Sequence, residues 1–171
     1  MAKVLFTSDL HLGHKNIGKW RHFARDKHEN TAVIAEKWFS SVNKRDTVFV
    51  LGDAVFTEEA LLEFKHFPGR KILVRGNHDY LSTKDYLTVF EEVHGITRYR
   101  TKHGVNAWLT HAPIHPEELR GKINIHGHVH YNPIKDKRYI NVCCDYLLQE
   151  TGDIFMTLSQ LREELNGEVV T

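Results

Sequence analysis

The sequence predicts a single α/β domain spanning residues 1–171, in which a partly parallel sheet is flanked by helices. Three observations indicate this class. A chain of 171 residues can bury one hydrophobic core but is too short for two enzyme domains. Apolar runs typical of strands alternate with helical patterns in the first half, as in parallel sheets with helical connections. Metal-binding types of side chain follow directly after several of these runs.

The apolar runs are interpreted as strands because β-branched and aromatic residues predominate in them and polar turns end them. The first three strands are expected at 3–7 (KVLFT), 47–51 (TVFVL) and 71–75 (KILVR). The second and third are each followed at once by glycine and a polar residue. Further strands are expected at 105–110, 122–125, 138–142 and 154–158.

Helical patterns lie between the strands. A helix is expected over 30–43, where apolar residues recur at near-helical spacing and Asn30 or Thr31 is the cap. Another is expected over 57–66, because a threonine cap precedes two glutamates that suit the positive end of the helix dipole. Its buried face is expected to contain Leu61, Leu62 and Phe64. A third helix is expected at 83–92, and Ser159 is expected to open a short last one.

Composition excludes several classes of protein. With 41% hydrophobic and 26% charged residues, the chain is neither disordered nor a coiled coil. A formal net charge of +1 means that any nucleic-acid contact must come from a local patch. No apolar run is long enough to span a membrane, and the first residues lack a leader pattern.

The two cysteines, Cys143 and Cys144, are adjacent in the chain and are badly placed for a disulfide. They are interpreted as small buried residues of a strand rather than as a redox pair. This cysteine usage favours a reducing, cytoplasmic setting.

Polar side chains from separate segments follow the predicted strands and are expected to meet at one sheet edge, where open α/β sheets bind ligands. They are Asp9, His11, Asp53, Asn77, His78, His111, His128 and His130. This inventory suits two divalent ions that share one carboxylate. Mixed imidazole and carboxylate ligands favour Mn, Fe, Zn or Ni over Ca or Mg. Two-metal sites are suited to in-line attack on phosphorus.

In order along the chain, the motifs DLH, GD, GNHD, H and GHVH resemble the five-motif signature of the calcineurin-like metallophosphoesterase superfamily. The similarity covers residues 9–130, and the later NVCCD stretch is similar to small bacterial and phage members. The resemblance implies a four-layer α/β/β/α fold, with two mixed sheets flanked by helices. It implies these metal ligands: Asp9, His11 and His130 for the first ion, Asp53 as the bridge, and Asn77, His111 and His128 for the second ion.

The resemblance also implies roles beside the metals. His78 would bind no metal and would donate a proton to the leaving-group oxygen, and Asp79, where the family more often has Glu, would orient His78. His14 and Asn16 are candidates for substrate contact, with surface or capping roles as the alternative. Arg75 is a further candidate, with packing of its stem on the sheet as the alternative. The histidines that follow no motif are expected to be structural or at the surface: His22, His28, His66, His94, His103 and His115.

The expected activity is hydrolysis of a phosphoester, with a metal-bridging hydroxide as nucleophile. A phosphodiesterase is the first prediction, because a short chain leaves little for a lid and an open site suits a diester. Manganese is the metal expected first, with Fe, Zn or Ni as alternatives. The expected substrate is a nucleotide or another small diester, and no membrane partner or particular oligomeric state is predicted.

Other functions stay open from the sequence. The protein could be a phosphomonoesterase or nucleotide pyrophosphatase using the same metals. It could process nucleic-acid ends, with the basic cluster 98–102 (RYRTK) as a docking strip. A scaffold without catalysis is the remaining alternative, although such members lose motif histidines and every motif position is filled here.

Overall fold

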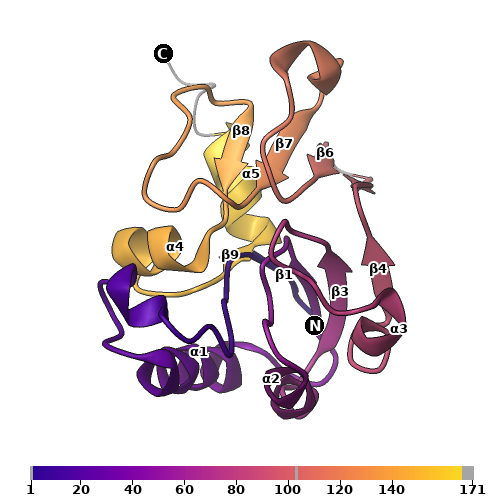
Figure 1. Cartoon of the computed structure of the whole chain (residues 1–171). Coiled ribbons are helices and arrows are strands. Elements are labelled where there is room, and N and C mark those ends of the chain that lie inside the picture. The colour runs from indigo at the N-terminus through magenta and orange to yellow at the C-terminus, as the bar shows by residue number, and fades with distance from the viewer. Residues whose placement is uncertain (1, 103, 167–171) are drawn as a thin grey trace.

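A computed structural model describes residues 2–102 and 104–166. Its first sheet has five strands in the order β4-β3-β2-β1-β9. They are β1 (Val4–Thr7), β2 (Thr47–Val50), β3 (Arg70–Val74), β4 (Glu92–His94) and β9 (Met156–Thr157). The first four run parallel and β9 is antiparallel to β1. The carboxyl ends of β1, β2 and β3 therefore meet at one edge (Figure 1).

The second sheet has four strands in the order β5-β6-β7-β8. They are β5 (Thr97–Arg100), β6 (Asn106–Leu109), β7 (Ile123–His126) and β8 (Tyr139–Asn141). The pairs β6–β7 and β7–β8 are parallel, and β5 is antiparallel to β6. Both sheets are mixed and are flanked by helices, as the resemblance implied.

The helices cover the sheets and join their strands. They are α1 (Lys27–Ser41), α2 (Glu58–Phe64), α3 (Thr83–Tyr86), α4 (Cys144–Thr151) and α5 (Leu158–Asn166), with 3-10 turns at Ile17–Lys19 and Pro116–Leu119. Within the described residues, no helix combines the length and apolarity needed to cross a membrane.

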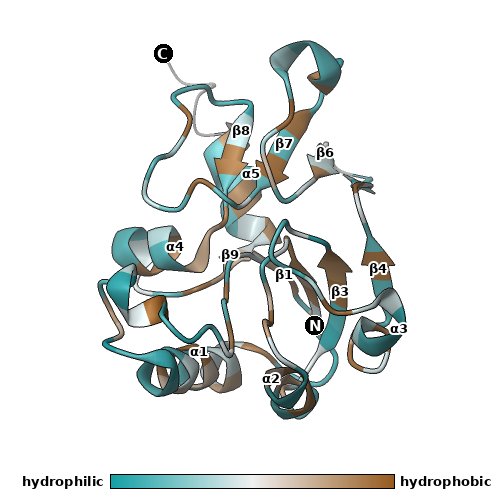
Figure 2. Ribbon diagram, viewed as in Figure 1, coloured by the Kyte–Doolittle hydropathy of each residue, from teal (hydrophilic) through white to brown (hydrophobic). Residues whose placement is uncertain are grey.

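Strand alternation divides the core in two. Leu5 points to the side of β1 where Trp38 of α1 packs, whereas Phe6 points between the sheets and contacts Tyr99 edge-on at 5.3 Å. In Figure 2, apolar colouring marks β3 and β7, and hydrophilic colouring marks much of α1. Two apolar layers therefore support the edge where the strand ends meet.

Several helix boundaries differ from the sequence-based expectation. The first helix begins at Lys27 because Asp26 accepts hydrogen bonds from the backbone N–H groups of His28 and Glu29. The third ends at Tyr86, and part of its expected length is strand β4 instead. The helix expected over 57–66 is present as α2, but its residue Leu62 is 62% exposed and does not join the core.

The expectation that the cysteines lie in a strand was wrong. Strand β8 ends at Asn141, Cys143 caps α4, and Cys144 is the first residue of that helix. A short apolar run has the same sequence pattern in a buried strand and in a buried helix turn, so periodicity alone does not distinguish the two. Strands β4 and β5 were not expected, because their polar sequences lack strand alternation of apolar residues.

Lys71 in β3 supplies a test of the first core. Lys71 is only 4% exposed, and its ammonium donates a hydrogen bond to the Phe67 carbonyl at 2.6 Å. Burial lowers the pKa of Lys71 from 10.5 to about 8, against the raising effect of Glu91. Between pH 8 and 10.5 the unfolded chain therefore binds more protons at Lys71 than the folded chain does. The contribution of Lys71 to the free energy of unfolding consequently rises with pH through that window.

We expect Lys71→Met to raise the midpoint of urea unfolding at pH 7, where the cost of burying the ammonium is fully present. The gain should shrink as pH rises above 8 and disappear beyond 10.5. Parallel unfolding curves of both proteins across this range measure the difference. A gain that did not change with pH would show that packing, and not the buried charge, sets it.

Candidate metal centre

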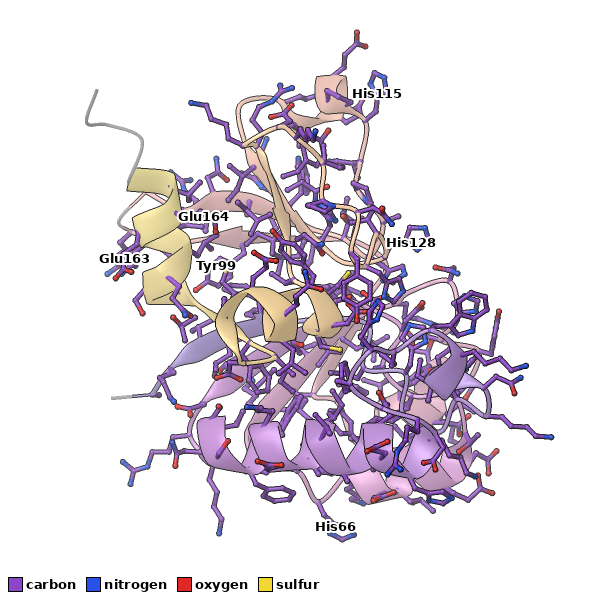
Figure 3. The ribbon with its side chains drawn as sticks, turned by 90° about the vertical axis from the view of Figure 1, so that its left-hand side faces the viewer. His66, Tyr99, His115, His128, Glu163 and Glu164 are labelled. Atoms are coloured by element: carbon purple, nitrogen blue, oxygen red, sulfur yellow. The ribbon has the colours of Figure 1, made fainter. Side chains whose placement is uncertain are left out.

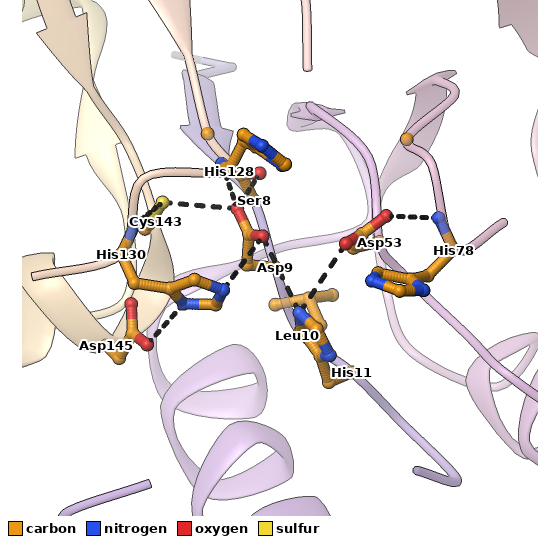
Figure 4. Close-up of polar contacts among 12 residues, drawn as sticks. Ser8, Asp9, Leu10, His11, Asp53, His78, His128, His130, Cys143 and Asp145 are labelled. Carbon is orange, nitrogen blue, oxygen red and sulfur yellow. Dashed lines mark hydrogen bonds and ion pairs between the residues drawn. The ribbon is translucent and has the colours of Figure 1, made fainter. Parts of the chain in front are cut away.

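Loops from both sheets bring the predicted site residues together. Asp9 and His11 follow β1, Asp53 follows β2, and Asn77 and His78 follow β3. From the second sheet, His111 follows β6 and the pair His128 and His130 follows β7. Figure 4 shows Asp9 between the loop of His130 on one side and that of Asp53 on the other.

The backbone at this edge is held in a conformation that side chains disfavour. Six described non-glycine residues have a positive φ, and five are predicted ligands. They are Asp9 (58°), His11 (51°), Asp53 (50°), His128 (72°) and His130 (47°). Such residues cost roughly 1–3 kcal/mol each and persist where the surroundings hold them. A cluster of them at one edge indicates a functional site.

Hydrogen bonds between the loops hold this backbone. The Asp9 N–H donates to the Gly52 carbonyl at 2.9 Å, and the His11 N–H donates to the Asp53 carbonyl at 2.9 Å. The His128 N–H donates to Asp9 Oδ2 at 2.9 Å. A Cβ atom at Gly127 would collide with Ser8 and Asp9. Glycine there lets the β7 loop lie directly on the β1 loop.

One group of donor atoms surrounds the Asp9 carboxylate. Asp9 Oδ1 lies 3.5 Å from His11 Nε2 and 3.6 Å from His130 Nε2. Asp9 Oδ1 and His11 Nε2 are buried and have no hydrogen-bond partner. Ligand atoms that share one ion at roughly 2.0–2.2 Å lie about 3–3.6 Å apart. The spacing and the unpartnered atoms fit a bound divalent cation.

A second group lies on the other side of Asp53. Asp53 Oδ2 is 3.7 Å from His11 Nε2 and 3.5 Å from His111 Nε2. His111 Nε2 lies 2.9 Å from Asn77 Oδ1 and 3.2 Å from His128 Nδ1. One Asp53 oxygen thus faces an imidazole of each group, so it is placed to contact an ion in either.

The electrostatics of these atoms favour positive charge between the carboxylates. Burial alone would raise the pKa of Asp9, but His11 and its neighbours outweigh it and hold that pKa well below the usual range. Burial opposes protonation of His111, yet Asp53 and Asp9 raise its pKa to about 9. The carboxylates therefore stay ionised, as metal ligands must be.

A buried polar layer behind the first group was not identified from the sequence. His130 Nδ1 lies 2.7 Å from Asp145 Oδ2, and the Arg21 guanidinium lies 3.2 Å from the same oxygen. Arg21 also donates to the Asp9 carbonyl. The signal available was a lone aspartate after the apolar NVCC run, but only folding brings it to Arg21 and His130.

The cysteines belong to this layer. Burial raises the pKa of Cys144 to about 12 and that of Cys143 well above its ordinary value, so both stay protonated. The Cys143 thiol donates to Asp9 Oδ2 at 3.2 Å and the Cys144 thiol donates to the Asp9 carbonyl at 3.1 Å. Since metal binding requires the thiolate, these thiols act as weak hydrogen-bond donors to Asp9.

Asp145→Asn is expected to weaken metal binding at the first group by about 10- to 100-fold, because a carboxylate on Nδ1 orients the imidazole and strengthens its Nε2 as a ligand. Manganese content after dialysis against a graded chelator measures the change. Asp153→Asn is the matched control, since Asp153 instead contacts the Ser41 hydroxyl near the end of α1. Equal metal retention in both variants would remove Asp145 from this role.

His78 lies beside Asp53 through its backbone, whose N–H donates to Asp53 Oδ1 at 2.9 Å (Figure 4). The orienting role expected for Asp79 needs correction. The Asp79 carboxylate accepts hydrogen bonds from the backbone N–H groups of Asp53, Ala54 and Gly76 and makes none to His78. The Tyr80 hydroxyl, 2.9 Å from His78 Nδ1, occupies that place. A short, buried carboxylate is better placed to hold the loop than to reach the ring.

The three candidates for substrate contact, His14, Asn16 and Arg75, have different surroundings in the structure. The His14 ring lies edge-on to Phe56 at 4.7 Å and lines a pocket beside the first group. Asn16 precedes the turn at 17–19 and makes no capping hydrogen bond with its side chain. Arg75 donates to the carbonyls of Asp79 and Leu81 and lies over the Tyr86 ring at 5.4 Å. Its guanidinium thus braces the loop that carries Asn77 and His78.

Several of the histidines expected to be structural or at the surface have contacts or positions away from these groups. His66 and His115 stand at opposite extremities of the molecule, whereas His128 lies between them (Figure 3). His94 pairs with Glu92 in β4. His22 contacts the Tyr131 ring edge-on at 4.7 Å, and His103 lies outside the described residues.

The basic cluster is divided by strand alternation. Arg98 and Arg100 are exposed on the edge strand β5, whereas Tyr99 points between the sheets against Phe6. The Tyr99 ring therefore packs in the core and does not lie beside the arginines, as base stacking in the nucleic-acid alternative would require.

The family model for calcineurin-like phosphoesterases matches residues 2–159. The chain belongs to this family. The Gene 66 protein of Mycobacterium phage L5 is 36% identical in an alignment of length 173, and the alignment covers 82% of this chain and 83% of that protein.

Two solved structures share the fold. A protein of unknown function from Aquifex aeolicus, AQ665, superposes with a TM-score of 0.70 at 27% identity, over 95% of this chain and 99% of that chain. A structure described as a novel archaeal phosphodiesterase gives a TM-score of 0.52 at 19% identity, over 88% of each chain. As a calcineurin-like phosphoesterase, the protein has the fold of metal-dependent phosphoester hydrolases and carries candidate metal-ligand clusters.

Proposed function

We propose that the protein is a phosphodiesterase that uses two divalent ions, manganese first among them. The observation that carries the proposal is the position of Asp53, whose Oδ2 lies between His11 and His111 at 3.7 and 3.5 Å. When bound, two ions at such a site supply a hydroxide nucleophile near neutral pH and neutralise the charge of the phosphate.

The residues around the ions have separate tasks in this proposal. Asp9, His11 and His130 hold one ion, Asn77, His111 and His128 hold the other, and Asp53 serves both. His78 donates a proton from Nε2 to the leaving oxygen, because its Nδ1 lies on the Tyr80 hydroxyl. Asp79 positions the loop that carries His78 through its backbone hydrogen bonds.

The surface around the centre supports a diester substrate. A first pocket of about 430 Å³, with His11, Trp20, Phe56, His78 and Tyr131 in its lining, adjoins the first group of donor atoms. A second pocket of about 390 Å³, with Arg75, Asn77, Ile96, His111 and Ile114 in its lining, adjoins the second group. A phosphodiester has a substituent for each, whereas a monoester would use only one.

Hydrolysis of bis-p-nitrophenyl phosphate and p-nitrophenyl phosphate, measured side by side, tests the proposal. The protein is stripped with chelator and reloaded with Mn²⁺, with the stripped form as control. Metal-dependent activity that favours the diester is expected. Preference for the monoester would make the protein a phosphatase, and metal binding without hydrolysis of either ester would favour the scaffold alternative.

A further inference from the structure

The first pocket adjoins the Asp9 group of donor atoms and shares three residues with the candidate metal centre. His11 and His130 are proposed ligands and His78 is the proposed proton donor, and all three line the pocket. A substituent that departs from phosphorus toward His78 would therefore enter this pocket. The second pocket has none of these three residues in its lining.

The walls of the first pocket are aromatic. The Phe56 ring lies nearly parallel to those of His11 and His78, with centroids 5.1 and 5.6 Å away and interplanar angles of 28° and 25°. Trp20 stands at the rim with 71% of its surface exposed. Stacking a flat ring on a large indole that is exposed to water at the mouth of a pocket is favourable, because it buries apolar surface of both rings.

The floor carries charge that is already balanced. Arg21 and Asp145 both line the pocket and lie 3.2 Å apart, each almost fully buried. The Arg21 guanidinium is therefore already paired with a carboxylate rather than placed to bind a second phosphate group. The lining suits a flat, neutral group with polar edges.

We propose that the first pocket binds the leaving nucleoside of the substrate, with its base stacked on Trp20. The inference rests on the proposed phosphodiesterase activity and adds the chemical class of one substituent. Stacking of a base on an aromatic side chain is tolerant of base identity. Trp20 therefore selects for the presence of a base rather than for a particular one.

Two diesters with the same scissile bond test the proposal. One is a dinucleoside monophosphate, and the other carries a stable tetrahydrofuran abasic sugar in place of the leaving nucleoside. Trp20→Ala should raise KM for the first about ten-fold or more, the effect of losing one stacked base, and should leave KM for the abasic diester and both kcat values unchanged. Trp20→Phe should restore most of the affinity.

Phe39→Ala is the matched control, because Phe39 is also an exposed aromatic residue but lies on α1 outside the pocket lining. Its kinetics should equal those of the unmodified protein. Equal KM values for the two diesters in the unmodified protein, with bis-p-nitrophenyl phosphate still hydrolysed, would overturn the nucleoside pocket and leave the phosphodiesterase proposal standing.

A binding measurement tests the nucleoside pocket independently of hydrolysis. Calorimetric titration of the manganese-loaded protein with a nucleoside 5′-monophosphate and with ribose 5-phosphate should show tighter binding of the nucleotide, lost in Trp20→Ala. This result would support the pocket even if no ester were hydrolysed. Equal affinity for the two ligands would overturn the inference regardless of activity.

Discussion

Asp53→Asn should remove metal binding and hydrolysis together. One oxygen of this carboxylate faces His11 and His111 at 3.7 and 3.5 Å, so both ions would lose a charged ligand at once. We expect activity on bis-p-nitrophenyl phosphate to fall on the order of a thousand-fold or more, since the ions supply the nucleophile and the charge stabilisation. Metal content per chain and the hydrolysis rate are measured on the same preparation.

The substitution is mild for the backbone. Asp53 has a φ of 50°, and asparagine tolerates this left-handed region as well as aspartate does. An unchanged circular dichroism spectrum would therefore accompany the loss of metal. Retention of two ions by the folded variant would contradict the bridging role of Asp53.

His78→Ala should separate metal binding from catalysis. The backbone N–H of His78, not its ring, contacts Asp53, so metal content should remain normal. Loss of general-acid catalysis should lower kcat by about 10²- to 10⁴-fold for diesters with alkoxide leaving groups. The loss should be much smaller for p-nitrophenolate, which departs without a proton.

Leaving-group dependence is the decisive readout for His78. Rates for a series of diesters that differ only in the pKa of the leaving alcohol are compared between the two proteins. Tyr80→Phe is an informative companion, because it removes the hydroxyl at His78 Nδ1 and leaves the ring in place. Equal losses across the series in His78→Ala would rule out proton donation by this side chain.

Much of the candidate metal centre could be predicted from the chain because its residues follow strands. Parallel strands end at the same edge, so Asp9, Asp53 and Asn77 had to meet once β1, β2 and β3 paired. The apolar strands are themselves readable from β-branched and aromatic composition. The proximity of these side chains thus follows from local patterns and one rule of sheet topology.

Local patterns did not indicate the contacts made by polar groups across the fold. Asp79 sits beside His78 in the chain, yet its carboxylate binds backbone N–H groups of the β2 loop. Asp145 follows the apolar NVCC run, and only the packing of α4 against the β7 loop brings it within 2.7 Å of His130. Side-chain direction in a turn depends on backbone dihedrals that sequence spacing does not specify.

The sequence by itself determined the α/β class and the set of side chains offered for metal binding, because these depend on residue type and strand order. Its five motifs also indicated the family, and the resemblance to that family implied the two-sheet architecture. Only the tertiary structure decided that the Asp145 carboxylate contacts His130. The tertiary structure likewise decided that the Tyr99 ring packs against Phe6 in the core and not beside the exposed arginines. It also decided that Trp20 stands at the rim of a pocket beside His78. The physical reason is that hydrogen bonds and pocket walls join residues distant in the chain, whereas strand and helix patterns are local.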